Sequence, residues 1–245
     1  MKLYELAFAS YTYNVSNDFN GTYKEFLEKT NNSLNLEKEE HQKSLLVWLN
    51  SWGCRQFIVE YHSMASKNIL NWYKNFSSYL PEKNKNIWEL DDKDYKSIAI
   101  AFDCLKQTKV SRRIKNQSEE DVTAGPTGTS KILFALRPKS LIPCDIPMRK
   151  HFRLKDSSEG YIDYLKIIKD IIIELEKECK QYGFEISELP EQLDSPNLTI
   201  PNLIDEYLWY TISNNIKPGN TKIPSMKLLN KWSQWSKDSL NMTKD

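Results

Sequence analysis

The stretch that decides the fold reads VTAGPTGTSKILFALRPKSLIPCDIPMRKHFR and covers residues 122–153. Gly125 and Gly128 are the only closely spaced glycines in the chain, and together with Pro126 they predict a tight turn. The apolar residues that follow recur at helical spacing as far as Pro138, which ends the run. The stretch therefore predicts a turn followed directly by a buried helix.

The predicted turn has the features of an anion site. Thr129 or Ser130 is expected to start the helix, so the turn lies at a helix N-terminus, where backbone N–H groups have no intrahelical partner. The helix dipole adds positive potential at the same place. Further positive charge nearby comes from Lys131, Arg137 and Lys139. A plain surface loop is the alternative.

Asp145 is the only acid within residues 122–153. It stands between Pro143 and Pro147 in an apolar run and is expected to open another helix. A carboxylate beside a phosphate site is electrostatically costly unless the chemistry uses it. The alternative is that Asp145 serves only as an N-cap, since Asp shortly before Pro is a common helix start.

The distribution of charge favours a polyanionic partner, although the net charge of the chain is only +1. Between residues 104 and 155 there are twelve lysines and arginines and four acids, which leaves +8 in this segment and −7 in the rest. A basic segment in an otherwise acidic protein is typical of a protein that binds a phosphate backbone. The alternative is a solvated charged surface.

The turn and the aspartate together resemble two motifs of the helix-hairpin-helix DNA glycosylases. In that family a hairpin of the type L-P-G-h-G-x-x-x-A holds DNA phosphates through backbone N–H groups, and a motif of the type V-D-x-H-V-x-R carries the catalytic aspartate. Residues 125–131 are similar to the hairpin. Residues 144–150 are similar to the aspartate motif, because the acid, the apolar residue and the arginine keep their places. The resemblance covers residues 98–153.

The departures from the family pattern indicate a distant member. The glycines are three apart rather than two, and the distance from Gly128 to Asp145 is shorter than usual. Members that also cut the strand carry a lysine right after the turn, where this chain has Thr129 and Ser130. Lys131 lies further into the helix and is expected to face away, which puts a Schiff-base lyase in doubt. The four-cysteine iron–sulfur loop of many relatives is absent from the sequence.

The resemblance implies an all-α fold with two helical lobes around a cleft. It implies a monofunctional DNA glycosylase that hydrolyses the N-glycosidic bond of a flipped-out modified or damaged base and leaves an abasic site, with Asp145 as the catalytic residue. No cofactor and no metal are expected. The partner would be double-stranded DNA containing a modified base, bound by a monomer. The residues expected to contact DNA are Gly125, Thr127, Gly128, Thr129, Ser130, Lys131, Arg149 and Lys150.

Several functional alternatives stay open from the sequence alone. One is a helix-hairpin-helix module that binds DNA without catalysis, and another is a helical adaptor that binds an acidic protein. Within the glycosylase hypothesis, the substrate is either a modified base of invading phage DNA, which would be an antiviral role, or a damaged base repaired in the cell's own genome. DNA binding whose affinity falls steeply with salt concentration, without base release, would favour the module.

Length and composition set the remaining expectations. A chain of 245 residues is expected to form one mostly helical unit over residues 1–245, or two small lobes, with residues 98–153 as the hairpin and aspartate segment. No apolar run is long enough for a membrane span, and Glu5 lies where a signal peptide would be apolar. The four cysteines are widely separated, which argues against zinc and favours a reduced, cytoplasmic protein.

Helical periodicity predicts the elements around this segment, and glycine scarcity disfavours hairpin-rich β folds. Most of the tryptophans at 48, 52, 72 and 88 are expected in the core, with one or two aromatic residues free to stack on an extruded base. The predicted helices cover residues 23–40, two helices between 41 and 80 with a break at Gly53, then 91 or 92 to 105, 163–181, 203–216 and 226 to about 240.

Overall fold

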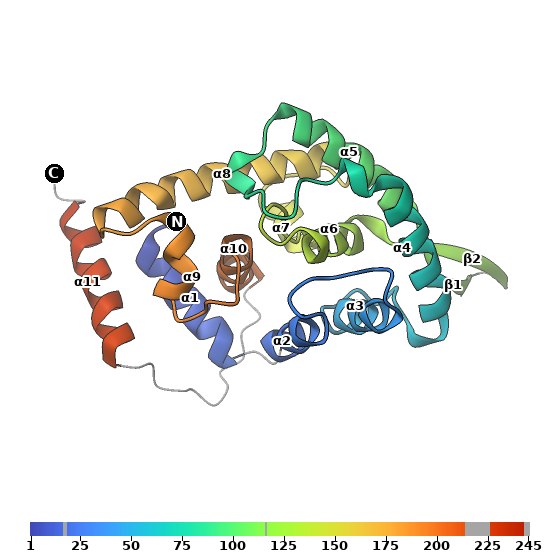
Figure 1. The fold of residues 1–245 in the computed structure, drawn as a ribbon, viewed down its shortest axis with the longest axis horizontal. Helices are drawn as coiled ribbons and strands as arrows, with labels where there is room; N and C mark the ends of the chain where they lie inside the picture. The colour runs from blue at the N-terminus through green and yellow to red at the C-terminus, as the bar shows by residue number, and fades with distance from the viewer. Residues whose placement is uncertain (17–18, 116, 214–225, 243–245) are drawn as a thin grey trace. The chain divides into compact units, whose positions relative to one another are not determined.

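The computed structural model describes residues 1–16, 19–115, 117–213 and 226–242 (Figure 1). The protein is mostly helical, with a single two-stranded sheet in the described residues, so the predicted helical class is confirmed at that level. The chain divides into two compact units. Unit 1 comprises residues 1–17 and 166–245, and unit 2 comprises residues 18–165. The predicted hairpin and aspartate segment, residues 98–153, lies entirely within unit 2.

Unit 2 is built from helices around a buried aromatic core. Its elements are α2 (Phe19–Lys29), α3 (Glu39–Ser51), α4 (His62–Phe76), α5 (Asp92–Lys106), β1 (Lys109–Lys115), β2 (Ser118–Thr123), α6 (Gly125–Leu136), α7 (Ile146–His151) and the first part of α8 (Ser158–Gln181). Short 3₁₀ helices cover Val59–Tyr61, Ser77–Tyr79 and Ile87–Glu89.

Unit 1 contains α1 (Leu3–Ser16), the remainder of α8, α9 (Leu189–Gln192), α10 (Ile200–Leu208) and α11 (Met226–Met242). A 3₁₀ turn covers Ile186–Glu188, and a π-helical turn covers Trp209–Ser213 directly after α10. The helix predicted at 203–216 therefore begins earlier, and its last three residues lie outside the described residues. No described helix has the length and apolar character needed to cross a membrane.

Two helices show how local sequence sets their bounds. Asp91 accepts hydrogen bonds from the backbone N–H groups of Lys93 and Asp94, both at 2.9 Å, and this capping box starts α5. The apolar stripe predicted for α8 is buried, and the helix ends before Gly183, which takes a positive φ of 79°. This helix begins at Ser158, five residues earlier than its periodicity predicts.

The predicted helix over residues 23–40 is wrong as one element. α2 ends at Lys29, and the backbone turns at Asn31 and Asn32, whose φ angles are 49° and 54°. Asparagine tolerates this left-handed conformation better than most residues, so the turn follows from its side chain. The predicted break at Gly53 is confirmed, because α3 ends at Ser51 and Gly53 has a φ of 80°.

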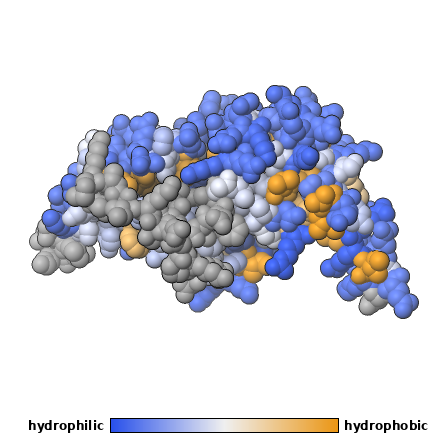
Figure 2. All heavy atoms as spheres, turned by 90° about the horizontal axis from the view of Figure 1, so that it is seen from below, coloured by the Kyte–Doolittle hydropathy of each residue, from blue (hydrophilic) through white to orange (hydrophobic). Residues whose placement is uncertain are grey.

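The β1–β2 ribbon is an element that the sequence did not predict. It is antiparallel, it follows α5 and precedes α6 in the chain, and β1 contacts α4, beside which the ribbon is drawn in Figure 1. Ion pairs join the two strands, with 3.0 Å between Arg112 and Glu119 and 3.3 Å between Arg113 and Glu120. The ribbon end of the face drawn in Figure 2 is mostly hydrophilic. Charged residues of opposite sign therefore line up across the strands and stabilise a ribbon with little apolar surface.

α6 begins at Gly125, not at Thr129 or Ser130. Pro126 occupies the first turn of the helix, where its fixed φ fits and its missing N–H is not needed. Residues 125–128 are therefore the first helical turn rather than a separate hairpin turn, and that part of the prediction is wrong. The helix is buried from Gly128 to Leu136.

Candidate functional site

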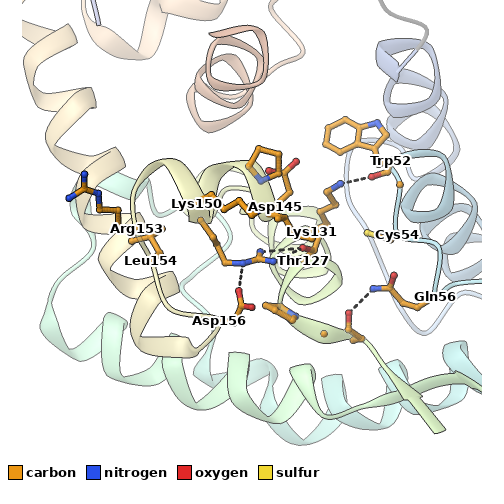
Figure 3. Close-up of a pocket in the computed structure, with 17 residues that line it drawn as sticks. Trp52, Cys54, Gln56, Thr127, Lys131, Asp145, Lys150, Arg153, Leu154 and Asp156 are labelled. Carbon is orange, nitrogen blue, oxygen red and sulfur yellow. Dashed lines mark hydrogen bonds and ion pairs between the residues drawn. The ribbon is translucent and has the colours of Figure 1, made fainter. Parts of the chain in front are cut away.

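The described part of unit 2 contains a cavity of about 1010 Å³ (Figure 3). Its walls come from three places in the sequence, namely residues 52–56 after α3, residues 124–131 at the start of α6, and residues 145–156 around α7. Four cations and two acids line it: Lys131, Arg149, Lys150, Arg153, Asp145 and Asp156. The cavity is therefore a polar site with a positive balance of charge.

The first turn of α6 forms one wall. Gly125 has a φ of 62°, a conformation that favours glycine, and Pro126 and Thr127 also line the cavity. The amide Nε2 of Gln56 donates to the carbonyl oxygen of Ala124 at 2.7 Å and ties this turn to the segment after α3. A helix start of this kind directs unpaired backbone N–H groups away from the helix body. The wall can therefore receive an anionic group.

Asp145 also lines the cavity, as the N-cap of α7. Its backbone is extended, with φ −90° and ψ −179°, and its Oδ1 accepts a long hydrogen bond of 3.4 Å from the N–H of Met148. The side chain is half-buried and lines the cavity. The predicted N-cap role is confirmed, and the same carboxylate faces the space where a ligand would lie.

Lys131 reaches the cavity, contrary to the expectation that it faces away. Its Nζ donates to the carbonyl oxygen of Trp52 at 2.5 Å and lies 5.5 Å from the centre of the Trp52 ring (Figure 3). The side chain is 6% exposed, so its ammonium is held in place rather than free in solvent. α6 packs against α3, and Lys131 lies on the side of α6 that faces the segment after α3.

Arg149 is bound within the protein and is 8% exposed. Its guanidinium donates to the carbonyl oxygen of Cys144 at 2.6 Å and to the hydroxyl oxygen of Thr127 at 3.2 Å, and it forms an ion pair with Asp156. These contacts fix α7 to the start of α6. In contrast, Lys150 and Arg153 are exposed and are the cations of the cavity that lie open to a partner.

Three residues predicted to contact DNA lie away from the cavity. Gly128, Thr129 and Ser130 are buried, and none of them lines the cavity walls. A Cβ added at Gly128 would lie 2.8 Å from Nε2 of Gln56 and 3.0 Å from the ring of Phe57. These side-chain positions serve packing, because helix α6 turns them toward the core.

Ser130 has a specific structural role. Its Oγ accepts a hydrogen bond of 2.9 Å from the backbone N–H of Cys144 and donates to the carbonyl oxygen of Thr127 at 3.0 Å. Because Cys144 directly precedes Asp145, this hydroxyl fixes the chain next to the carboxylate. The structure gives the Ser130 side chain this positioning role, and its contact with DNA stays a prediction.

The sequence did not single out the wall formed by the residues after α3. Trp52 is half-buried, and the centroid of its ring lies 4.8 Å from that of Trp48 and 5.4 Å from that of Tyr23. Cys54 is buried, and burial raises the pKa of its thiol; Lys131 opposes this rise and Asp145 adds to it. The helix break at Gly53 was the one sequence signal near this wall, and nothing in the pattern linked it to Asp145.

The basic segment is more neutral than its sequence suggests. In the ribbon, Lys109 pairs with Asp121 at 2.6 Å, in addition to the arginine pairs of β1. Arg137 is buried and donates to the backbone carbonyl oxygens of Pro81 and Leu136. Part of the positive charge is therefore bound within the protein, whereas Lys150 and Arg153 at the cavity are exposed, as are Lys115 and Lys139 elsewhere in the segment.

Comparisons with known proteins add no family to this geometry. Within the described residues, no group of three or more histidine, cysteine or acidic side chains is placed to hold a metal ion. No protein-family model matches the chain, and no curated protein or solved structure matches it either.

Proposed function

We propose that the protein is a monofunctional DNA glycosylase and that Asp145 is its catalytic residue. One observation carries the proposal, namely that Asp145 lines a large cavity together with the first turn of α6 and the exposed cations Lys150 and Arg153. A carboxylate next to a phosphate-binding surface is the arrangement that N-glycosidic hydrolysis needs.

The proposed reaction is the hydrolysis of the bond between a base and C1′ of its deoxyribose. As this bond breaks, the sugar develops oxocarbenium character, and the negative charge of Asp145 stabilises it. The oxygen of a water molecule bonds to C1′, Asp145 accepts a proton from that water, and the departing base takes up a proton. The products are the free base and an abasic site.

The DNA backbone would bind across the first turn of α6. Backbone N–H groups there, with the side chains of Lys150 and Arg153, supply contacts that do not depend on sequence. The finer fold that we propose is a variant of the helix-hairpin-helix arrangement, in which the first turn of α6 takes the role of the hairpin. In this chain the β1–β2 ribbon directly precedes α6.

The flipped base would occupy the side of the cavity formed by Trp52 and Gln56. Flipping of a nucleotide out of the stack costs a few kcal/mol. Modified bases of phage DNA and damaged bases of the cell's own genome remain the two substrate classes of the proposal.

The experiment is incubation of the protein with duplexes that carry different modified or damaged bases, followed by mass spectrometry of the released bases. Release of one base, with an abasic site left in an unbroken strand, is the expected result. Strand cleavage together with release would contradict the monofunctional assignment, and duplex binding without release of any base would support the second candidate.

The second candidate is a DNA-binding module without catalysis. The observation that favours it is the hydrogen bond from the N–H of Met148 to Asp145, because it gives this carboxylate a structural role. The module and the enzyme share the same DNA surface, so only base release separates them.

A further inference from the structure

A groove in unit 1 has a composition quite different from that of the cavity. Its volume is about 550 Å³, and half of the residues that line it are aromatic. The rings belong to Tyr4, Phe8, Tyr207, Tyr210 and Trp232. Glu5 is the only charged residue among the described residues that line it. Aromatic faces with one carboxylate form an environment that favours a cation.

Three elements bring these rings together. α1 supplies Tyr4 and Phe8, which are four residues apart and share one face of the helix. Tyr207 and Tyr210 come from the end of α10 and the π-helical turn after it, and Trp232 comes from α11. The arrangement is local to unit 1 and is independent of the proposed DNA site.

Phe8 is the most informative member of the groove. Its side chain is 54% exposed, although its neighbours Ala7 and Ala9 on α1 are buried. The ring meets Tyr210 edge to face, with 6.1 Å between centroids and an interplanar angle of 82°. Two aromatic rings held at such an angle can present their faces to one ligand.

No lysine or arginine is among the described residues that line this groove. The backbone N–H of Lys2 donates to Oε2 of Glu5 at 2.7 Å, and the amino group of Lys2 pairs with Glu178 at 3.0 Å. The pairing with Glu178 raises the pKa of this amino group, and the charge of Glu5 raises it further. Lys231 precedes Trp232, but its Nζ lies 5.5 Å from the centre of the Trp235 ring. Burial raises the pKa of the Tyr207 hydroxyl, and the charge of Glu5 raises it further, so the groove already has negative potential.

The type of cation follows from the aromatic rings, which stand beside the hydroxyl groups of Thr211, Ser233 and Ser236 in the groove wall. The faces of these rings offer no acceptor for the three N–H donors that a primary ammonium carries. A methylated ammonium has few or no donors, and its charge is attracted by the ring quadrupoles. We propose that this groove binds a trimethylammonium group, with the aromatic rings around the methyl groups and Glu5 balancing the charge.

The test compares choline with its neutral isostere 3,3-dimethylbutanol, by ligand-observed NMR titration of the full chain. The two probes have the same shape, so a difference in affinity reports the positive charge. We expect choline to bind saturably and the isostere to bind about fivefold to tenfold more weakly. Equal affinities would reduce the site to an ordinary hydrophobic groove and overturn the proposal, as would an absence of choline binding.

Variants locate the binding. Phe8→Leu keeps an apolar side chain and removes the aromatic face, and Glu5→Gln removes the charge; each is expected to weaken choline binding at least threefold. Tyr79→Leu alters an exposed aromatic residue of unit 2 and should leave choline binding unchanged. Tyr210→Leu is the second aromatic variant if the melting temperature of Phe8→Leu falls. Unchanged binding in a folded aromatic variant would overturn the assignment.

A trimethylammonium group can belong to a free small molecule or to a trimethyllysine side chain. Titration with a short peptide that carries trimethyllysine, beside the same peptide with unmodified lysine, distinguishes the sources. Tighter binding of the methylated peptide than of choline would support a protein ligand. Binding of choline with no binding of either peptide would support a small molecule.

Discussion

The ribbon and the cavity are two regions of one basic segment, and their arginines differ in exposure and in hydrogen-bond partners. In the ribbon, Arg113 is 61% exposed and pairs with Glu120 across the strands. At the cavity, Arg149 is 9% exposed at its side chain and donates to the carbonyl oxygen of Cys144. If Arg113 is lost, water can hydrate its partner Glu120 instead. If Arg149 is lost, the buried carbonyl oxygen of Cys144 loses its hydrogen-bond donor. Equal charge in the sequence therefore implies neither equal stability nor equal access to a partner.

Replacement of Asp145 by asparagine gives the largest effect that we expect. Asn keeps the shape and the N-cap, but it cannot stabilise a cation or accept a proton, so single-turnover base release should fall about 10²- to 10⁴-fold. The melting temperature should stay near that of the unchanged protein.

The matched control is Asp156→Asn, which alters the other carboxylate of the cavity. Asp156 is 72% exposed at its side chain, and its variant should retain base release within a few fold. If Asp145→Asn releases base within about threefold of the unchanged rate, Asp145 is only a cap.

The two arginines themselves give the second test. Arg149→Met should lower the free energy of unfolding by about 2–3 kcal/mol, because a buried carbonyl loses a charged donor. Arg113→Met should change it by less than about 1 kcal/mol, as is usual for exposed pairs. Urea unfolding of both variants measures the difference, and equal losses would contradict the distinction between the two regions.

Packing behind the cavity is tested by Gly128→Ala. The added methyl meets Gln56 and Phe57, and we expect a loss of about 1–3 kcal/mol in the free energy of unfolding. Gly21→Ala in α2 is the control, since nothing lies within 4 Å of its added Cβ, and it should gain about 0.5–1 kcal/mol. A neutral Gly128→Ala would show that Gln56 and Phe57 move aside.

The smallest expected effect concerns DNA affinity. Lys150→Ala should reduce the slope of log affinity against log salt by about one unit, as for one lost phosphate contact. Arg113→Ala should leave the slope unchanged, because its charge is already neutralised within the ribbon. A change of slope in both variants would extend the DNA surface to the ribbon.

The sequence predicted well those elements whose apolar residues lie on one face. α8 is the best case, since its buried stripe from Leu165 to Cys179 follows helical spacing. α1 was not predicted, because its apolar and polar residues are mixed around the helix without a clear period. The ribbon was not predicted because its strands carry runs of like charge rather than alternating hydrophobicity, namely Arg112 and Arg113 in β1 and residues 119–121 in β2. The pairing of these opposite charges becomes visible only across the turn.

The candidate site was predicted in part. Asp145 and the start of α6 were identified because their unusual residues are close together in the sequence. Trp52, Cys54 and Gln56 could not be identified, since they lie about seventy residues earlier and approach the site only through packing of α3 against α6. The internal role of Arg149 was hidden for the same reason, because charge alone does not reveal hydrogen bonds to backbone.

In the proposed enzyme, the hydroxyl of Ser130 would couple DNA binding to the chemical step. It joins the helix whose first turn would hold the phosphates to the residue that precedes Asp145. This hydrogen bond would restrict movement of the carboxylate relative to the bound backbone and so limit its adjustment to different bases. Discrimination between substrates must then occur earlier, in whether a nucleotide leaves the stack and enters the cavity at all. In such an enzyme the extent of base flipping would differ between bases. The rate of bond cleavage would be nearly the same for every base that has entered the cavity.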